Sequence, residues 1–518
     1  MRKINKGEKK GIVRAKMTAE ITLHELASFC TRLGFFYPSG RIYGGLSGFY
    51  DYGPLGAELR RDVLNDWWWY FVERRDDIIG IHGSIITHPR TWVASGHVDS
   101  FIDFIVTCPK CGFEYRADHL LEDRGIQIPE LTLETLSKLI KKHNIKCPKC
   151  GGTLSDPSPF NLMFITYVGP KKVDASIAYL RPETAQLIFT NFRNIIMTIG
   201  VKLPFGIAQY GKAFRNEISP RGFLFRLREF EQMEIEFFVN PKKLDDCPYY
   251  NKVKSMEINL LSAEMQDKGE KEGKIVTIED AVDNGLIGCK WHAYWIAESL
   301  QWLKNIGVNY NRLRVREHIK TELAHYAVQT FDVEFLFPQA GWKEIEGISN
   351  RSDYDLKRHE EFSREEMHVY DDGEKIIPYV IEPSFGLERV ILAVLISSYR
   401  EIKGRRVLSL HPKVAPIKVG VFPLVSKSEF LEKAREVYLS LKEEFRTIYE
   451  AKDSIGRRYA KADERGVPIC VTIDGQTLED DTVTIRFRDT REQIRVSISA
   501  LKEEINKVFK NWHNYTSS

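Results

Sequence analysis

The chain has 518 residues, more than one hydrophobic core usually supports, so we expect about two to four domains. Hydrophobic residues make up 43% of the sequence and charged residues 28%, which is typical of soluble globular proteins. The formal net charge of +3 is too small to indicate a partner by itself, and no apolar run approaches the ~20 residues that span a bilayer. We therefore expect a soluble cytoplasmic protein with no membrane partner.

The chain begins with a basic tail. Residues 1–16 hold seven Lys or Arg against one Glu, and we predict that they form a disordered, solvated arm. The alternative is an arm that holds RNA phosphates. The tail has neither the apolar stretch of a signal peptide nor the Ser-rich amphipathic pattern of a transit peptide.

Residues 17–100 start with a helical pattern and continue into a Gly- and Tyr-rich passage that ends at Pro54. Proline suits the first turn of a helix. Behind it an apolar residue recurs every four positions, which predicts a long amphipathic helix with its stripe at Leu55, Leu59, Val63, Trp67 and Phe71. The segment that ends at Pro89 predicts a short strand stopped by proline.

Two cysteine pairs lie 39 residues apart, each with a Pro-Lys interior and a following glycine. They surround a polar helical stretch in residues 101–160, which we interpret as an inserted module. Eight cysteines in so long a chain argue against a disulfide framework. The spacing fits a structural zinc site whose four thiolates leave no open position, and four reduced thiols are the alternative. The predicted zinc ligands are Cys108, Cys111, Cys147 and Cys150.

Strands and turns dominate the pattern from 176 to 238. Residues 240–310 then become rich in Lys and Glu with helical periodicity, and we predict a second, helical insertion there. Strand signals resume from about 333 to 385. Glu344 and Glu346 are predicted to share one strand face, which is consistent with a metal site, although an exposed acidic strand shows the same alternation.

The segment from Gly211 to Phe238 predicts a hairpin whose second strand has two different faces. Its polar face carries Arg228, Phe230, Gln232, Glu234 and Glu236. Its apolar face carries Met233, Ile235 and Phe237. One interpretation is an exposed edge hairpin with a polar outer face. The other is a ligand surface, because an aromatic ring stands among alternating carboxylates and opposite Arg215 and Glu217.

A short strand from Ile381 turns at Gly386 into a largely apolar helix. The amino terminus of a helix carries free N–H groups and a partial positive charge, so it is a natural seat for phosphate. Arg389 lies in the first turn, where a cation is unfavourable for the helix. A nearby anionic ligand explains that position, and a surface arginine tolerated by water is the alternative.

Prolines in residues 411–416 mark a stiff linker. Beyond it, strands and helices alternate over about a hundred residues, which predicts a compact α/β domain. The predicted elements are strand 417–422, helix 428–445, strand 469–473, strand 482–488 and helix 498–509. Arg486 and Arg488 share a strand face with Phe487 opposite, so an RNA-binding face and a solvated basic strand both fit.

Together, the hairpin and the helix start resemble the signature motifs of class II aminoacyl-tRNA synthetases. Phe214–Glu217 with Arg228–Phe230 resembles motif 2, and Gly386–Arg389 resembles motif 3. The helix from Pro54 to Phe71, with the strand that ends at Pro89, resembles motif 1, which builds the dimer interface in that class.

Further segments look like the glycyl-tRNA synthetases in particular. They are Tyr43–Leu46, Asp51–Gly56, Ala94–His97, Arg181–Gln186, Phe230–Glu234 and Glu382–Ser384. The resemblance covers about residues 20–510 and is to the dimeric form found in archaea, eukaryotes and some bacteria.

The resemblance implies an α+β catalytic domain of class II, built on an antiparallel sheet flanked by helices, over residues 17–412 with its insertions. It also implies a C-terminal α/β anticodon-binding domain over residues 413–518. The implied reaction activates glycine with ATP to glycyl adenylate and pyrophosphate, then transfers glycine to the 3′ end of tRNA(Gly). The implied cofactor is Mg²⁺ with ATP, the implied assembly is a homodimer, and DNA is not an expected partner.

The resemblance also implies the site residues. Arg215 and Arg389 are the catalytic residues, on the α- and γ-phosphates respectively. The ATP-binding residues are Arg215, Asn216, Glu217, Phe225, Arg228, Glu229, Phe230, Glu344, Ile345, Gly386, Leu387, Glu388 and Arg389. The glycine-binding residues are Arg116, Glu183, Phe230, Glu231, Gln232, Met233, Glu234, Glu382, Pro383, Ser384 and Gly386. Glu344 is also the implied Mg²⁺ ligand.

Two other functions stay open at this point. A class II ligase for another small amino acid is opposed by the acidic residues and by the segment 181–186. A noncatalytic synthetase-like protein typically loses its ATP-binding residues, whereas Arg215, Glu217, Phe230 and Arg389 are all present. Exchange of pyrophosphate into ATP with single amino acids separates these functions.

Overall fold

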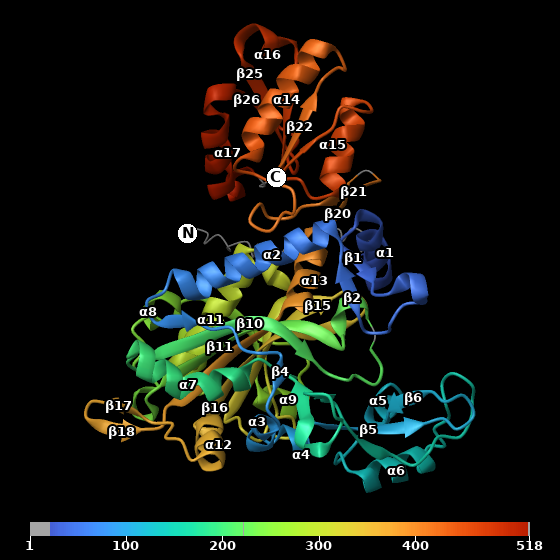
Figure 1. Ribbon diagram of the computed structural model, residues 1–518, viewed down its shortest axis with the longest axis vertical. Helices are drawn as coiled ribbons and strands as arrows, with labels where there is room; N and C mark the ends of the chain where they lie inside the picture. Colours follow the sequence, from blue (N-terminus) through green and yellow to red (C-terminus); the bar gives the residue numbers. More distant parts are fainter. Residues whose placement is uncertain (1–20, 221, 403, 516–518) are drawn as a thin grey trace, which may run out of the picture.

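The computed structural model describes residues 21–220, 222–402 and 404–515. The chain forms a large body and, beyond it, a smaller C-terminal body (Figure 1). The predicted basic tail, residues 1–16, lies outside the described residues. In the described part of the chain, no helix combines the length and the apolar character needed to cross a membrane.

The large body is built on a nine-stranded sheet with the order β13-β12-β14-β15-β16-β19-β11-β10-β3. Neighbouring strands are antiparallel except in the pairs β10–β3 and β12–β14. The strands are β3 (Ile78–Gly80), β10 (Phe205–Phe214), β11 (Glu229–Val239), β12 (Glu257–Leu261), β13 (Lys274–Thr277), β14 (Leu313–Glu317), β15 (Gln329–Phe337), β16 (Gly341–Ser352) and β19 (Tyr379–Gly386). The expected sheet, largely antiparallel, is therefore confirmed.

Helices cover the two faces of this sheet unequally. The main ones are α2 (Pro54–Trp68), α7 (Ala185–Ile199), α11 (Lys290–Asn305), α12 (Tyr354–Ser363) and α13 (Leu387–Ser398). Helices α2, α11 and α13 pack over Met233, Ile235 and Phe237 and form the main core. On the other face, α7 and α12 cover the region around Phe205 and Phe238. The rest of that second face, beside the polar residues of β11, is where the pocket lies.

The predicted amphipathic helix is α2. Pro54 occupies its first turn, and Leu59, Val63 and Trp67 are fully buried against the core. The helix continues to Glu73 as a π-helical turn. Smaller elements precede and follow it in the chain: α1 (Leu23–Leu33), β1 (Phe36–Pro38), β2 (Tyr50–Tyr52), β4 (Ile86–Thr87), α3 (Pro89–Ala94) and α4 (His97–Ser100).

Two regions differ from the expected pattern. The stretch from 176 to 238 contains α7, whose β-branched and aromatic residues have low helix propensity and read as strand. Burial of Ile188, Phe189 and Phe192 stabilises this helix instead.

The predicted helical insertion at 240–310 is wrong in type, because β12 and β13 extend the main sheet and α11 belongs to the main core. Its other helices are α8 (Tyr250–Val253), α9 (Ala263–Asp267) and α10 (Ile278–Asp283).

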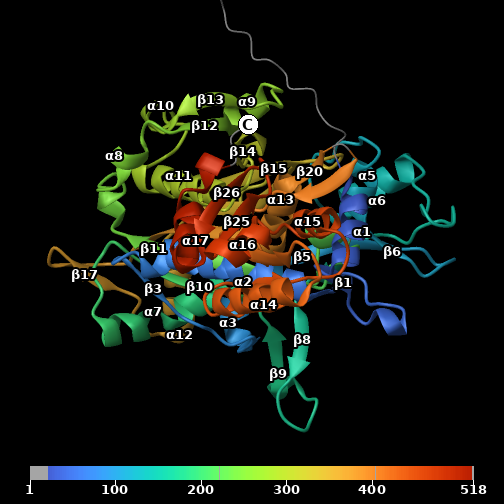
Figure 2. The same cartoon turned by 90° about the horizontal axis from the view of Figure 1, so that it is seen from above.

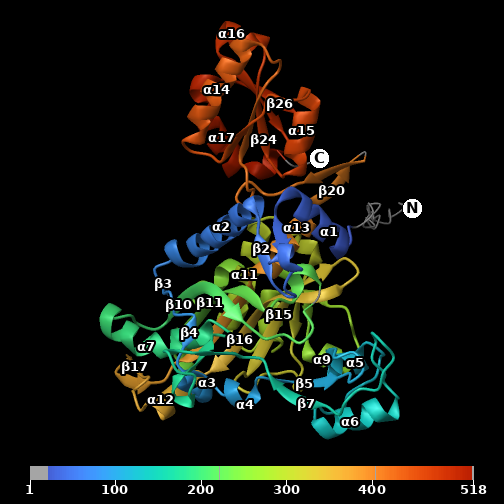
Figure 3. The same ribbon diagram turned by 45° about the vertical axis from the view of Figure 1, so that its right-hand side comes forward.

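The cysteine-bearing segment forms a small module with its own core at the end of the large body away from the C-terminal body (Figure 3). Its elements are β5 (Ile102–Thr107), β6 (Glu114–Arg116), α5 (Ala117–Glu122), α6 (Leu133–Lys142) and β7 (Ser158–Asn161). Directly after it, β8 (Phe164–Tyr167) and β9 (Ile177–Leu180) form an arm that projects from the body (Figure 2). The hairpins β17 (Val369–Asp371) with β18 (Glu374–Ile376) and β20 (Tyr399–Ile402) with β21 (Arg405–Leu408) complete the large body.

The C-terminal body is a five-stranded sheet with the order β23-β22-β24-β25-β26 and helices on both faces. The strand and helix alternation predicted from the sequence is present, together with elements that the pattern did not indicate. In chain order these elements are β22 (Val419–Pro423), α14 (Ser428–Lys442), β23 (Thr447–Tyr449), α15 (Ile455–Glu464), β24 (Ile469–Ile473), α16 (Gly475–Asp480), β25 (Thr482–Phe487), β26 (Gln493–Ser497) and α17 (Leu501–Lys510). Lys418 ties this body to α2, because its Nζ donates to Asp62 at 2.7 Å.

Candidate active site

A pocket lies between the hairpin β10–β11, the loop that joins its strands and the start of α13. The two arginines that the motifs singled out, Arg215 and Arg389, line this one cavity although 174 residues separate them in the chain. The remaining lining residues are Glu217, Leu224, Phe225, Arg226, Leu227, Phe230, Gln232, Glu344, Ser384, Gly386 and Glu388.

Arg215 lies just beyond the end of β10 and is held on both its backbone and its side chain. Its N–H donates to Arg228 O at 2.9 Å, and its Nε donates to Pro182 O at 3.1 Å. The guanidinium carbon lies 5.2 Å from the ring centre of Phe230 and 5.3 Å from that of Phe101. A guanidinium fixed by ring contacts and one hydrogen bond keeps its remaining N–H groups for a ligand.

Arg389 lies in the first turn of α13 and pairs with Glu344 of β16. Its Nη1 contacts Glu344 Oε2 at 2.9 Å, and its guanidinium carbon is 5.2 Å from the ring centre of Phe225. The side chains of Arg389 and Glu344 are 29% and 47% exposed. The carboxylate offsets the unfavourable position of a cation at a helix amino terminus, and an anionic ligand of the pocket would do the same.

The loop between β10 and β11 uses its arginines differently from the expectation. Arg228 stabilises the loop, since its Nε donates to Glu217 O at 2.8 Å and its Nη1 to Ser47 O at 3.1 Å. The residue that lines the pocket is Arg226, whose Nε lies 3.5 Å from Glu217 Oε2. The sequence analysis did not predict Arg226. The signal that could have found it is its position just before Arg228 and Phe230, which belong to the segment that resembles motif 2.

Next to the pocket lies an acidic cage, which we define as the buried carboxyl groups of Glu183, Glu234, Glu236 and Glu382. Ser384 lies at the boundary, because it lines the pocket and its hydroxyl donates to Glu234 at 2.6 Å. Thr184 also donates to Glu234. The carboxyl oxygens of Glu234, Glu236 and Glu382 lie within 4.8 Å of one another. Glu236 was placed on this strand face by its alternation but was not among the expected glycine contacts.

Cations and amide groups surround the cage. Glu183 lies 3.2 Å from His97 Nε2 and accepts from Gln186 Nε2 at 3.1 Å. Glu382 accepts from the buried Arg351 at 2.7 Å. Arg351 in turn pairs with Asp355 and lies 3.9 Å from the ring centre of Tyr326. Buried carboxyl groups therefore outnumber the positively charged partners that contact them directly, Arg351 and His97.

Burial and repulsion divide the pKa values of these groups. Burial, together with the neighbouring carboxylates, raises the pKa of Glu234 and holds the pKa of Glu236 and of Glu382 well above the usual range. Burial acts in the same direction on Glu183, but His97 and more distant arginines outweigh it and lower the pKa of that carboxyl. Glu183 is therefore the member of the cage that loses its proton most readily.

Strand alternation separates the predicted glycine contacts on β11 into two groups. Phe230, Gln232 and Glu234 face the pocket and the cage, whereas Met233 is buried in the main core. Glu231 also lies on the core side, where Arg60 of α2 pairs with it. The side chains of Glu231 and Met233 are therefore not brought to the ligand face.

Glu388 faces the pocket and also links it to β2. Its carboxylate accepts from the N–H of Glu231 at 2.9 Å and from the hydroxyl of Tyr52 at 3.0 Å. Burial, with repulsion from Glu231, raises the pKa of Glu388 to about 7. This network fixes the start of α13, and with it the position of Arg389.

A β-bulge changes the predicted metal pair on β16. The pairing with β15 shifts between Glu344 and Glu346, so that Ile345 is the extra residue. Glu344 consequently reaches the pocket, while Glu346 is fully buried and accepts a hydrogen bond from Ser299 of α11. The expectation that the two glutamates share one face is wrong, because alternation breaks at a bulge.

Other expected site residues contribute backbone or lie elsewhere. Glu229 contacts Lys212 at 3.2 Å, and the N–H of Asn216 donates to Leu162 O at 2.7 Å. Arg116 belongs to the cysteine-bearing module, where it contacts Asp103 at 2.9 Å. Pro383 lies in β19 beside the cage residues. The side chains of Ile345 and Leu387 are part of the main core.

Known proteins share this architecture. Residues 172–398 match the tRNA synthetase class II core domain (G, H, P, S and T), and residues 418–508 match the anticodon binding domain. The glycine–tRNA ligase of Treponema denticola is 42% identical over 505 residues, which cover 95% of this chain and 98% of that protein. That of Caldanaerobacter subterraneus subsp. tengcongensis is 42% identical over 95% of this chain and 100% of that protein.

The chain belongs to the glycine–tRNA ligase family. A solved structure of prolyl-tRNA synthetase from Cryptosporidium parvum is also similar, with a TM-score of 0.57 and 14% identity over 95% of this chain and 78% of that chain. At that identity the likeness concerns the fold alone, and it agrees with the class II architecture. The family and the fold class that the sequence motifs implied are therefore confirmed.

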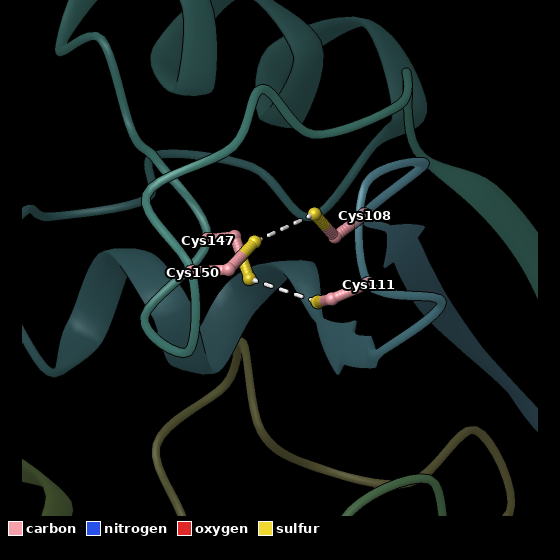
Figure 4. A group of neighbouring side chains, drawn as sticks. All are labelled: Cys108, Cys111, Cys147 and Cys150. Carbon is pink, nitrogen blue, oxygen red and sulfur yellow. Dashed lines mark hydrogen bonds between the residues drawn. The ribbon is translucent and has the colours of Figure 1, made fainter.

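In this member of the glycine–tRNA ligase family, the four predicted zinc ligands converge on one point (Figure 4). The sulfur atoms of Cys108 and Cys150 are 3.5 Å apart, and those of Cys111 and Cys147 are 3.7 Å apart. Around zinc, four sulfurs at about 2.3 Å form a tetrahedron with edges of about 3.8 Å. The separations fit that tetrahedron, so the residues present suit the metal.

The expected RNA-facing arginines of this ligase's C-terminal domain are buried. Arg486 pairs with Asp463 at 2.8 Å, and Arg488 pairs with Asp489 at 2.8 Å. Phe487 points into the domain core as predicted. Arg486 and Arg488 therefore stabilise the domain, and the sequence pattern of an exposed basic strand does not hold there.

Proposed function

We propose that the pocket and the acidic cage together activate glycine with ATP and pass it to tRNA, so that the chain works as a glycine–tRNA ligase. One observation carries this proposal. Arg215 and Arg389, from separate segments of the chain, line a single cavity, and Ser384 joins that cavity to the cage. A site for phosphate therefore adjoins a site for a small cation.

Neither chemical step needs a nucleophile from the protein. In the first, a carboxylate oxygen of glycine attacks the α-phosphorus of ATP, the bond to the bridging oxygen breaks, and pyrophosphate leaves. In the second, a ribose hydroxyl of tRNA attacks the carbonyl carbon of glycyl adenylate, and AMP leaves. Catalysis then rests on positioning the reactants and on stabilising the charge that develops on phosphate.

The nucleotide half of the site supplies these functions through its cations and rings. Arg215, fixed against Phe230, holds the α-phosphate, and Arg389 holds the γ-phosphate. The ring of Phe230 stacks on adenine, with Glu217 beside the adenine end. Bound Mg²⁺ would neutralise phosphate charge, and Glu344 suits it as an oxygen ligand because its carboxylate lines the pocket and stays half-exposed.

Glycine has no side chain to read, so the protein must recognise its ammonium group and exclude larger amino acids. Glu183, Glu234 and Glu382 offer carboxyl oxygens to the ammonium, and Ser384 orients Glu234. A difference of one methyl group in a binding pocket changes the binding free energy by only about 1–3 kcal/mol, so rejection of alanine must come from a steric wall. The packed walls of the cage supply that bulk.

We also propose that the four cysteines bind a structural zinc ion. With four thiolates as ligands the ion has no open position for substrate, so its function is to crosslink the module. The module's own core is small, which makes such a crosslink valuable for its stability. Metal analysis of the purified protein should find about one zinc per chain.

For assembly, we propose a cytoplasmic homodimer that contacts tRNA(Gly) through its C-terminal domain. Trp69, directly after α2, and Ile86 of β4 are 50% and 53% exposed, which supports an interface that involves these two segments. Light scattering during gel filtration checks the assembly, since it should report twice the mass of the 60.0 kDa chain.

Exchange of labelled pyrophosphate into ATP, with twenty amino acids offered singly, tests the proposed function. We expect exchange with glycine alone. Exchange with no amino acid would favour a noncatalytic synthetase-like protein, and exchange with alanine or serine would favour a different ligase.

A further inference from the structure

Glu236 is the one member of the acidic cage that the proposed reaction leaves without a task. The register of β11 and β19 pairs Glu234 with Ser384 and Phe237 with Ile381, which places Glu236 opposite Glu382. Like charges that face each other across two strands destabilise a sheet. The two carboxyl groups therefore cannot both be charged at low cost in this buried position.

The hydrogen bonds of the cage set Glu236 apart. Glu183, Glu234 and Glu382 each have a partner that donates a hydrogen bond or a positive charge. Both carboxyl oxygens of Glu236 lack a hydrogen-bond partner among the described residues, and the side chain is completely buried. A charged carboxylate in such surroundings loses its hydration without compensation.

The groups packed around Glu236 do not neutralise it. Its partner across β10 is the apolar Ile207. The charged groups that act on it are Glu382 of β19, Arg351 of β16, Glu234 of β11 and Asp355 of α12. Two further titratable groups lie beyond these: Glu183 acts on Glu382, and Asp355 acts on His359 of α12. Arg351 is already paired with Asp355 and Glu382. Burial accordingly holds the pKa of Glu236 well above the usual range.

We infer that Glu236 holds a proton while the site is free of glycine, and that entry of the glycine ammonium drives this proton into solvent. The inference rests on the proposed function of the cage as the ammonium site. Before binding, the proton removes a negative charge that no hydrogen-bond partner of Glu236 compensates. After binding, the ammonium supplies the missing positive charge, so the carboxyl group releases its proton to water. Glu236 thus couples glycine affinity to pH.

Thermodynamic linkage gives the size of the effect. When binding releases one proton and the pH is below the pKa of the group, the dissociation constant of the ligand falls tenfold for each unit by which the pH rises. Above that pKa the dissociation constant no longer changes with pH. The KM for glycine should therefore fall by up to tenfold per pH unit towards that limit. The KM for ATP should not share this slope, because Glu236 does not line the nucleotide pocket.

Glycine-dependent exchange of pyrophosphate, followed from pH 5.5 to 8.5, tests the inference on three proteins. They are the wild type, Glu236→Gln and, as a matched control, Glu346→Gln, which neutralises another fully buried glutamate outside the site. In the wild type the glycine KM should change by up to about tenfold per pH unit, and in Glu236→Gln this dependence on pH should disappear. Glu346→Gln should keep the wild-type slope.

Equal slopes in the wild type and in Glu236→Gln would overturn the inference. Absence of any glycine-dependent exchange in the wild type would instead contradict the proposed function. Should Glu236→Gln fail to fold, as circular dichroism would show, calorimetry of glycine binding to the wild type decides. Titrations in two buffers with different ionisation enthalpies should report about one proton released per glycine at pH 6, and none released would overturn the inference.

Discussion

The nucleotide pocket and the acidic cage handle charge in opposite ways. In the pocket, Arg389 and Glu344 form an ion pair in which both side chains stay partly exposed. In the cage, Glu234, Glu236 and Glu382 are buried, and Arg351 is the arginine that pairs with the group. The pocket therefore keeps an exchangeable pair of opposite sign, while the cage keeps an excess of buried carboxyl groups.

This difference predicts how substitutions in each region affect activity and stability. An exposed ion pair contributes little to stability, so Arg389 can exchange its carboxylate for phosphate with little effect on the fold. Buried like charges raise the free energy of the folded state until a cation arrives. Substitutions in the pocket should therefore change activity alone, whereas substitutions in the cage should change activity and stability in opposite directions.

The largest effect is expected from the arginines. Arg215→Ala and Arg389→Ala should each lower kcat/KM for exchange by about 10³-fold, because each removes a charge-assisted contact to phosphate in the transition state. Neither variant should lower the midpoint of thermal unfolding by more than about 2 °C, since Arg389 leaves behind a half-exposed Glu344.

Arg193→Ala is the matched control, because this arginine is partly exposed, pairs with Glu365 at 3.3 Å and does not line the pocket. Its exchange activity should stay within twofold of the wild type. A similar loss in all three variants would show that the pocket arginines have no special role.

The next largest effect should come from the cage. Glu234→Gln should raise the KM for glycine by about 10²-fold, because truncating a charge that meets a buried cation costs roughly 2–5 kcal/mol. The same change should raise the midpoint of thermal unfolding without glycine, since it removes one source of repulsion. The KM for ATP should remain unchanged. A variant that loses both glycine affinity and stability would break the proposed distinction between the two regions.

A smaller effect is expected from the zinc site, which lies outside both regions. Cys147→Ser should lower the zinc content well below one per chain and unfold the small module, because its own core is modest. We propose that the module contacts the acceptor stem of tRNA, so charging of tRNA should fall about tenfold when the stem is misplaced, while exchange of pyrophosphate should stay within about twofold. A parallel loss of both activities would mean that the module supports the pocket directly, for example through Arg116 and Asp103.

How far the sequence predicts these regions depends on how local the signal is. Alternation along β11 places Phe230, Gln232 and Glu234 correctly, because a regular strand has a strict period of two. The same rule fails for Glu346, since a single extra residue at Ile345 reverses the faces. The prediction of strands also fails for α7, where burial overrides the low helix propensity of the segment.

Residues that act through contacts distant in the chain had no local signal. Arg351 reaches the cage from the end of β16, and His97 reaches Glu183 from a short helix 86 residues earlier. Neither has a neighbour in the sequence that indicates its partner. Arg486 and Arg488 show the converse, because their pattern indicates an exposed basic face and tertiary ion pairs bury both side chains.

The smallest expected effect sharpens the comparison by separating burial from function. Glu346 is as deeply buried as the cage acids and its pKa is held well above the usual range by burial, yet it lies outside the site and accepts from Ser299. The folded protein therefore binds a proton that the unfolded chain releases. The stability linked to this proton is complete below the unfolded pKa and is lost as the pH rises towards the folded pKa.

Glu346→Gln removes that dependence, because the amide is neutral at every pH and its oxygen can still accept from Ser299. The midpoint of thermal unfolding should match the wild type near pH 5 and exceed it by about 2–4 °C at pH 8. The glycine KM should stay unchanged at both values. An equal shift at pH 5 and pH 8 would trace the difference to packing, and would contradict the view that burial of a carboxyl group sets the pH dependence of stability at this position.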